Sequence, residues 1–289
     1  MEHKLEIRRK SAIFLNGRPL SSYEFDSTQI IKDYILAYNS KSFTIYSPSG
    51  IVVAYKNYEV VSVVSDYIVV QENGLKGLFS YDGNCILPTR FDTITLNSNG
   101  ISNAIIVTSN NLYGVYSYEG KVILPIEFNY VFLTPEGIKV QKDGLCGAYS
   151  YYGKLILTPN FDSIDFKEKL IIVNKNGLYG AYSYENFEII PTIFYSISYT
   201  INGLKVWKDN LCGLYSFEGQ LIIPIKFTSI SFINDTILVQ EDNLLFGLYS
   251  KFGKLLIPVF YYDILFTSSG CTEVKKGKND PYVPYKIQY

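Results

Sequence analysis

Apolar residues along this chain recur mostly at every second position, in short runs separated by Asn, Asp or Gly at intervals of roughly 7 to 10 residues. Clear examples are Ile138–Gln141 and Ser163–Phe166, and the short runs Tyr130–Leu133 and Leu170–Val173 occupy the same places in their units. A period of two places successive side chains on opposite faces of a strand. No window carries the i, i+3, i+4, i+7 stripe of a helix. The pattern therefore predicts an all-β chain of short strands.

One unit of about 33 residues recurs along the chain. Six segments follow the pattern Gly-x-Tyr-Ser-x-x-Gly with small departures, and begin at Gly77, Gly114, Gly147, Gly180, Gly213 and Gly247. Two weaker copies, Phe14–Gly17 and Tyr46–Gly50, precede them. The eight predicted turns fall at Gly17, Gly50, Gly83, Gly120, Gly153, Asn186, Gly219 and Gly253. One longer step contains Asn97–Gly100, whose composition predicts a loop.

Five of the turns are followed by an apolar run that ends in proline, as in Leu221–Pro224, and by an aromatic residue such as Phe227. Because proline has no N–H to donate, we expect it to mark the end of a strand. The glycine that opens each segment predicts a position crowded by the neighbouring backbone or by a large aromatic side chain. With the two alternating segments that follow, each unit is expected to hold four short strands.

The block Gly-Leu-x-Gly-x-Tyr-Ser-x-x-Gly-x-x-Ile-x-Pro-x-x-Phe-Asp-x-Ile resembles the bacterial WG-repeat family, over about residues 11 to 265. The residue before the anchor glycine, which is Trp in that family, is never Trp in this chain. It is Lys76, Tyr113, Cys146, Tyr179, Cys212 and Phe246. The resemblance implies a repeat-built interaction module and supplies no catalytic residue.

A unit this small cannot bury both of its faces, so we expect the units to stack within one repeat domain, residues 1–289. A β-propeller-like ring is the favoured arrangement, and an open β-solenoid is the alternative. The chain begins at a third strand, Ser11–Leu15, and ends after two strands, Tyr262–Thr267 and Thr272–Lys276. These two parts could complete one blade. The segment Tyr282–Ile287 is left over.

Charge argues against a nucleic-acid partner. The formal net charge is -1, from 26 basic and 27 acidic residues, whereas phosphate binding depends on clustered Lys and Arg. The short run Arg8-Arg9-Lys10 is expected to be an exposed strand end. No apolar run has the length of a signal peptide or a membrane span, so we expect a cytoplasmic protein without a membrane partner.

Chemistry-bearing residues are sparse. The one histidine, His3, leaves almost no material for histidine catalysis or His-based metal sites. We expect no enzyme, no cofactor and no metal site. The four cysteines have no paired spacing, and we expect reduced core or strand residues even though two of them occupy equivalent places. They are Cys85, Cys146, Cys212 and Cys271.

Acidic residues recur at the turns, where backbone conformation alone favours polar side chains. They are Asp82, Glu119, Glu185 and Glu218. Asn234-Asp235-Thr236 fits a glycosylation acceptor, but without a secretion signal we expect only a loop.

Binding is the function that the sequence favours, with another protein as the expected partner. Aromatic residues are abundant, with 27 Tyr and 18 Phe. The single tryptophan, Trp207, lies where other units carry Gln141, Asn174 or Gln240, and is therefore the expected exposed contact residue. The alternative is a glycan or small ligand that stacks on repeated Tyr faces.

The repeat predicts that no unit is stable alone. A fragment carrying one copy should be unfolded, while the circular dichroism spectrum of the whole chain should be that of β-structure with little helix. A helix-dominated spectrum, or a cooperative melt of the one-copy fragment, would contradict the assignment.

Overall fold

The computed structural model describes residues 5–8, 12–20, 25–31, 34–39, 42–50, 52–56, 59–64, 66–80, 82–96, 104–267 and 272–287. These residues form strands and turns and contain no helix. The all-β prediction is therefore confirmed. His3, Arg9, Lys10, Cys271 and the loop at Asn97–Gly100 lie outside the described residues.

The chain divides into two compact units. Unit 1 comprises residues 1–144 and 149–155, and unit 2 comprises residues 145–148 and 156–289. The prediction of one domain over residues 1–289 stays a prediction, and each unit is described by itself.

Unit 1 is built from short strands in the order that the repeat predicts. They are β1 (Leu5–Arg8), β2 (Ala12–Leu15), β3 (Arg18–Pro19), β4 (Ser27–Ile31), β5 (Tyr34–Asn39), β6 (Ser42–Tyr46), β7 (Val52–Lys56), β8 (Glu59–Val64), β9 (Tyr67–Glu72), β10 (Leu75–Ser80), β11 (Cys85–Phe91), β12 (Thr93–Leu96), β13 (Ala104–Ser109), β14 (Leu112–Ser117), β15 (Val122–Phe128), β16 (Tyr130–Leu133) and β17 (Ile138–Lys142).

The strands that follow β17 have the same lengths and order, and nearly all of their residues belong to unit 2. They are β18 (Leu145–Tyr149), β19 (Leu155–Phe161), β20 (Ser163–Phe166), β21 (Ile171–Lys175), β22 (Leu178–Tyr182), β23 (Glu188–Phe194), β24 (Ser196–Thr200), β25 (Gly203–Lys208), β26 (Leu211–Tyr215), β27 (Leu221–Phe227), β28 (Ser229–Ile233), β29 (Thr236–Gln240), β30 (Phe246–Ser250), β31 (Leu255–Tyr261), β32 (Asp263–Phe266), β33 (Thr272–Lys275) and β34 (Val283–Tyr285).

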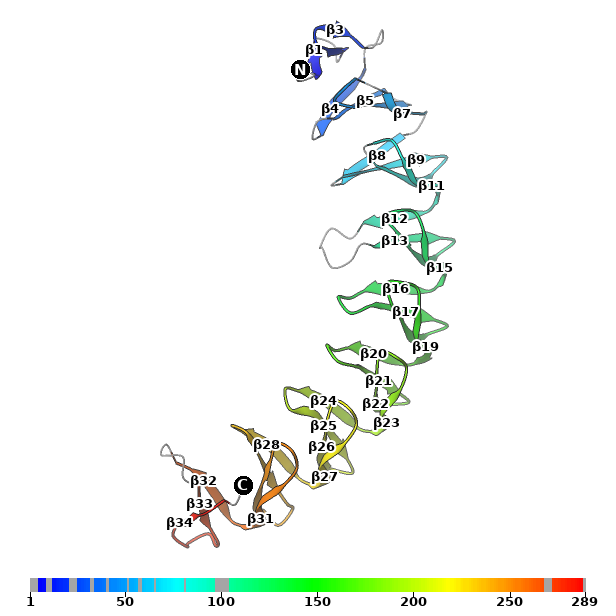
Figure 1. Ribbon diagram of the computed structural model, residues 1–289. Coiled ribbons are helices and arrows are strands. Elements are labelled where there is room, and N and C mark those ends of the chain that lie inside the picture. The colour runs from blue at the N-terminus through cyan, green and yellow to red at the C-terminus, as the bar shows by residue number, and fades with distance from the viewer. Residues whose placement is uncertain are drawn as a thin grey trace. The chain divides into compact units, whose positions relative to one another are not determined.

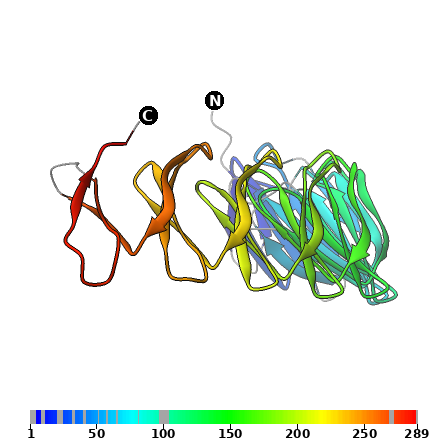
Figure 2. The ribbon, with the colours of Figure 1, turned by 90° about the horizontal axis from the view of Figure 1, so that it is seen from below.

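Within each unit the sheets are antiparallel meanders, in which spatial order equals chain order. Unit 1 holds β1-β2-β3, β4-β5-β6-β7, β8-β9-β10-β11 and β12-β13-β14-β15, and unit 2 holds β20-β21-β22-β23, β24-β25-β26-β27, β28-β29-β30-β31 and β32-β33-β34. Within unit 1, consecutive sheets follow one another from blue to green in Figure 1, and within unit 2 consecutive sheets follow one another from green to red in Figure 2. Apart from the three-stranded sheets at the two ends, each sheet holds four strands, which is the number predicted for each repeat of about 33 residues.

The turn between the third and fourth strands explains the repeated Ser-x-x-Gly. In the sheet of β24–β27, the N–H of Gly219 donates to the carbonyl of Ser216 at 3.2 Å. The Ser216 hydroxyl oxygen accepts bonds from the N–H groups of Glu218 and Gln220, both at 3.2 Å. All eight predicted turn residues have a positive φ, Asn186 included (69°), a conformation that Gly and Asn adopt most readily. The predicted turns are confirmed.

A second kind of turn joins the second and third strands. Pairs such as Asn176 (φ 54°) and Gly177 (φ 77°) have positive φ at both positions, the geometry of a two-residue hairpin turn that matches the twist of its strands. The Asp162 carboxylate, located after β19, accepts the N–H of Asn176 at 2.6 Å. Asp162, which follows Phe161 in the repeated Phe-Asp pair, thus stabilises the hairpin turn between β21 and β22 of the next sheet.

The anchor glycine is required because the fourth strand bulges against it. In the pairing of β26 with β27, Cys212 faces Phe227 and Leu214 faces Ile223, with a register shift between them. A Cβ on Gly213 would lie 2.6 Å from the Ile225 side chain and 2.9 Å from the Ile223 carbonyl oxygen. Of the two causes of crowding expected from the sequence, the neighbouring strand is the one observed.

The same bulge corrects the role predicted for proline. Pro224 lies inside β27 (Leu221–Phe227) and does not mark its end. A bulge leaves residues unpaired, so a proline there costs no ladder hydrogen bond. Proline on an edge strand also hinders pairing with other chains.

The sheets pack face to face through an aromatic pair that recurs with the repeat. Phe194, 1% exposed, meets Tyr215 of the next sheet with ring centroids 6.0 Å apart and planes at 67°. Edge-on pairs of this kind contribute about 0.5–1.5 kcal/mol beyond the area they bury. The corresponding pairs are Phe91–Tyr116 and Phe128–Tyr149 in unit 1, and Phe161–Tyr182, Phe227–Tyr249 and Tyr261–Tyr285 in unit 2.

Aliphatic side chains complete each contact between sheets. In unit 1, Leu36, Phe43 and Ile45 of one sheet share a buried cluster with Ile68 and Val70 of the next. In unit 2 the cluster that contains Phe194 also contains Leu204 and Val206 of the following sheet. The core is therefore a series of layers between sheets, one for each repeat.

The two ends of the chain each form a sheet from their own strands. β1 and β3 flank β2, and the leftover segment Tyr282–Ile287 contributes β34, which pairs with β33. The expected single blade built from both ends is therefore not what the described residues form. The choice between a ring and an open stack stays a prediction.

Gly213→Ala should destabilise the chain by about 1–3 kcal/mol, because the new methyl group overlaps the bulge of β27. Gly177→Asn is the matched control. Asn210 occupies the equivalent turn position at φ 65° and nothing lies within 4 Å of a Cβ on Gly177, so its effect should stay within about 0.5 kcal/mol. Urea unfolding midpoints measure both, and equal midpoints for Gly213→Ala and wild type would contradict this account.

Candidate functional site

Trp207, the contact residue expected from the sequence, is half-buried rather than exposed. It lies on β25 and packs against the cluster of Cys212, Phe227 and Ile230 in the contact with the next sheet. The Lys205 ammonium lies 4.7 Å from the centre of the Trp207 ring and donates to the Ile230 carbonyl at 2.8 Å. The expectation of an exposed side chain is wrong because Trp207 packs against the neighbouring sheet. Its role in partner contact stays a prediction.

The equivalent cysteines Cys146 and Cys212 are core residues, as expected. They are 6% and 0% exposed, and neither forms a disulfide. Burial raises the pKa of the Cys212 thiol, against a smaller lowering by Lys205. A buried thiol with a raised pKa is a poor nucleophile. Cys85 begins β11 and is exposed.

The repeated acidic residues hold turn positions. The N–H groups of Glu119, Glu185 and Glu218 each donate to the serine hydroxyl of their turn. A separate hydrogen bond of its own carboxyl group with Ser117 lowers the pKa of the Glu119 side chain. Asp82 accepts the hydroxyl of Tyr34 at 2.6 Å. These carboxylates are spread over separate turns, as the sequence predicts.

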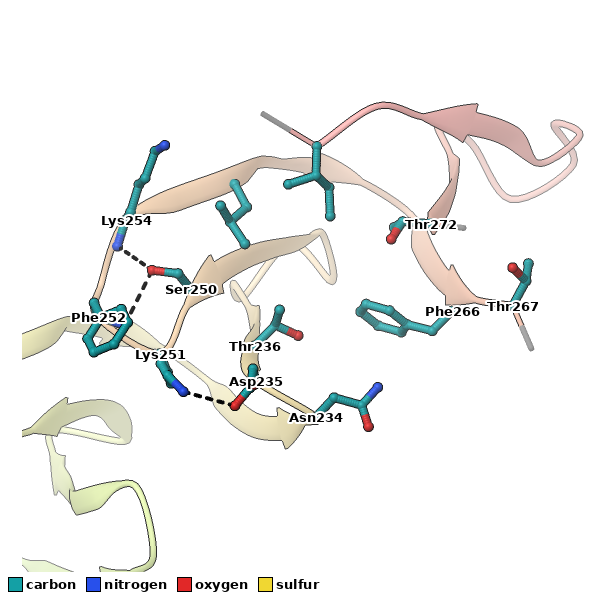
Figure 3. Close-up of a pocket in the computed structure, with 12 residues that line it drawn as sticks. Asn234, Asp235, Thr236, Ser250, Lys251, Phe252, Lys254, Phe266, Thr267 and Thr272 are labelled. Atoms are coloured by element: carbon teal, nitrogen blue, oxygen red, sulfur yellow. Dashed lines mark hydrogen bonds and ion pairs between the residues drawn. The ribbon is translucent and has the colours of Figure 1, made fainter. Parts of the chain in front are cut away.

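A cavity of about 610 Å³ lies between the last two sheets of unit 2. Figure 3 shows the ion pair of Lys251 and Asp235, 3.1 Å, at its edge and Phe266 on the side of β32. Asn234-Asp235-Thr236, the glycosylation-like triplet, forms a turn here as expected for a loop. Leu256 and Ile287 supply further apolar lining.

Comparison with the preceding contact explains this cavity. A Cβ on the turn glycine Gly253 would lie 2.5 Å from the carbonyl oxygen of Ile222, on the fourth strand of the sheet before it. Leu256 is the equivalent of Ile222 in the next sheet, and it lines the cavity instead. Elsewhere in unit 2, this place is occupied by the turn between the third and fourth strands (the 3–4 turn) of the following sheet. The last sheet has three described strands, β32, β33 and β34, and so contributes no such turn among the described residues.

Large apolar side chains are exposed at one end of the sheets of unit 2. Phe187 is 71% exposed, Ile201 92% and Phe252 83%. Each belongs to a different sheet and lies in the turn between its first and second strands (the 1–2 turn) or between its third and fourth strands (the 3–4 turn). In an antiparallel sheet of four strands, these two turns are at the same end of the sheet. Lys251 and Asp235, one from each kind, pair through side chains and backbone.

Sequence reasoning missed this apolar end. The signal was a departure from the repeat, since the position of Phe187 is Gln220 in the next unit and the position of Phe252 is Glu218 in the unit before. At the opposite end, the 2–3 turns described in unit 2 carry mainly Lys, Asp, Asn and Gly, together with the exposed side chains of Leu244 and Tyr282.

Among the described residues, no group of three or more His, Cys, Asp or Glu side chains is placed to hold a metal ion. The same residues contain no helix with the length and apolar character that crossing a membrane requires.

Two repeats of the chain match a known family model. The model of the WG containing repeat matches residues 153–179 and 213–244. The resemblance drawn from the Gly-x-Tyr-Ser-x-x-Gly pattern is therefore confirmed at these repeats. No curated protein matches the chain.

Solved structures with low sequence identity also align with the chain. The computationally designed Ika8 protein is 10% identical, with 90% of this chain and 95% of that chain covered and a TM-score of 0.27. Kluyveromyces lactis Hsv2 is 12% identical, with 86% and 90% covered and a TM-score of 0.29. A eukaryotic initiation factor is 10% identical, with 100% and 96% covered and a TM-score of 0.32.

The buried thiols should resist alkylation. Iodoacetamide at mildly alkaline pH should modify Cys85 in the folded chain, and Cys146 and Cys212 only after unfolding in urea, because burial blocks access and raises the pKa of Cys212. Peptide mapping by mass spectrometry identifies each site. Modification of Cys212 at the rate of Cys85 would contradict a core role.

Proposed function

We propose that this chain is a non-enzymatic interaction scaffold that binds another protein through the exposed apolar end of unit 2. The observation that carries the proposal is the alignment of Phe187, Ile201 and Phe252, one from each of three consecutive sheets, at the same end.

Exposure of this kind is costly for a protein that has no partner. Single exposed apolar residues are ordinary, but several on one surface favour a protein contact. Aromatic side chains such as Phe187 and Phe252 give large contact areas at low entropic cost. Glu185 and Lys251 lie two and one residues before them, so charged groups surround the apolar surface.

A repeat of stacked sheets suits this role. Because neighbouring sheets hold one another in place, side chains on successive turns keep their spacing. The near-neutral charge supports a protein partner over nucleic acid. Our proposal includes a cytoplasmic location and no membrane partner.

The alternative, a glycan or small ligand bound on repeated Tyr faces, has less support. The tyrosines of the Gly-x-Tyr pattern, such as Tyr182 and Tyr215, meet phenylalanines of the preceding sheet edge-on. Burial in these contacts raises the pKa of both hydroxyls. Rings used in this way offer little free face to a sugar.

The triple substitution Phe187→Ser, Ile201→Ser and Phe252→Ser should abolish partner binding and preserve the fold. The partner is first identified by affinity purification with the wild-type chain and recovered in stoichiometric amount. Its affinity should then fall by at least about tenfold in the variant, since buried aromatic anchors dominate interface energies. Calorimetric titration with the purified partner measures the change.

Leu244→Ser is the matched control, because Leu244 is 62% exposed in a 2–3 turn at the opposite end. It should leave the affinity unchanged, and both variants should keep the wild-type thermal midpoint within a few degrees. Failure to recover any stoichiometric protein, or equal affinity for the triple variant and wild type, would contradict the proposal.

A further inference from the structure

A polar groove of about 280 Å³ lies between the sheets β20–β23 and β24–β27 of unit 2, at the side of their first strands. Ser163 and Asp165 alternate along β20, with Ser163 opposite Asn174 and Asp165 opposite Ile172. Side chains on directly paired positions share one face of a sheet. The strand β24 closes the groove from the other side with Ser198 and Tyr199.

The groove brings hydrogen-bond donors and hydrogen-bond acceptors together. Asp165 and Lys167 form an ion pair of 2.6 Å, which holds an acceptor and a donor in place with almost no net charge. Within the described part of the chain, the side chains of Ser163, Asn174 and Ser198 make no hydrogen bond to protein, although all three line the groove. Their hydroxyl and amide groups are available to a ligand.

Two aromatic rings border these polar groups. Tyr199 packs against Phe217 with centroids 5.0 Å apart, so its ring is held in a defined orientation. Tyr179 lies beside Asn174, opposite it in the pairing of β21 and β22. Neither tyrosine belongs to the edge-on pairs that join the sheets. They are therefore unlike Tyr182 and Tyr215, whose rings are used in the core.

The groove is open at a position where the next contact between sheets is filled. In the next contact the position of Asn174 is Trp207 and the position of Tyr179 is Cys212, and both pack into the buried cluster between the sheets. A Trp at one position thus fills space that Asn174 leaves open.

We propose that this groove binds one neutral sugar ring of a glycan. Paired hydroxyl groups of a sugar need neighbouring donors and acceptors, which Asn174, Asp165 and Lys167 provide, while a tyrosine ring packs against its apolar face. The balanced charge of Asp165 and Lys167 disfavours phosphate or carboxylate ligands. This site is separate from the apolar end at Phe187, Ile201 and Phe252.

The test is glycan binding by the whole chain. An array of neutral glycans should give selective, saturable binding to at least one terminal sugar, confirmed by calorimetric titration of that glycan. Asn174→Trp, which copies Trp207, should weaken binding by at least about tenfold, as should Asp165→Ala, which removes the acceptor and the partner of Lys167. Both should retain the wild-type circular dichroism spectrum.

Gln240→Trp is the control, since Gln240 is the equivalent position in the sheet β28–β31, outside the groove. It should bind the glycan as wild type does. The proposal is overturned if no neutral glycan binds, if binding is unchanged in a folded Asn174→Trp variant, or if Gln240→Trp loses binding equally. Loss of the protein partner in the triple variant leaves glycan binding intact, so the two proposals fail separately.

Discussion

Edge-on packing of a phenylalanine from one sheet against a tyrosine of the next is the interaction on which this structure depends. A sheet of four short strands exposes two faces and cannot bury either alone. Phe194 and Tyr215 illustrate the solution, with the phenylalanine fully enclosed and the tyrosine spanning from core to surface. Because the pair recurs in both units, each layer stabilises its neighbours, and stability is a property of the stack.

The turn and the bulge of each repeat constrain the backbone, and they fix the spacing of about 33 residues at which the aromatic contact recurs. The serine hydroxyl and the positive φ of the turn residue close the third and fourth strands, as at Ser216 and Gly219. The anchor glycine admits the bulge of the fourth strand, as Gly213 does beside Ile225. Few residue types satisfy either condition, so Gly and Ser recur while the surrounding apolar residues vary.

The proposed binding surfaces, in contrast, lie where side chains at equivalent positions differ between neighbouring units. Phe187 and Phe252 replace polar turn residues and leave apolar surface exposed. Asn174 stands where Trp207 fills the equivalent space, which opens a polar groove. A stack of interchangeable layers can accommodate such substitutions, because each one changes only its own contact. We infer that the repeat supplies the framework and that side chains which vary between its units supply the binding surfaces.

The sequence alone determined the all-β class, the four strands per unit and the eight turn residues, because turns and alternation are local properties of the chain. It placed the proline wrongly at a strand end and expected an exposed Trp207 where the side chain is half-buried, since the bulge and the neighbouring sheet are not visible in a single unit. Only the tertiary structure decided which side chains meet across sheets, as Phe194 and Tyr215 do, and which line one groove, as Tyr199 and Asn174 do. Contacts between units depend on packing, which no local pattern encodes.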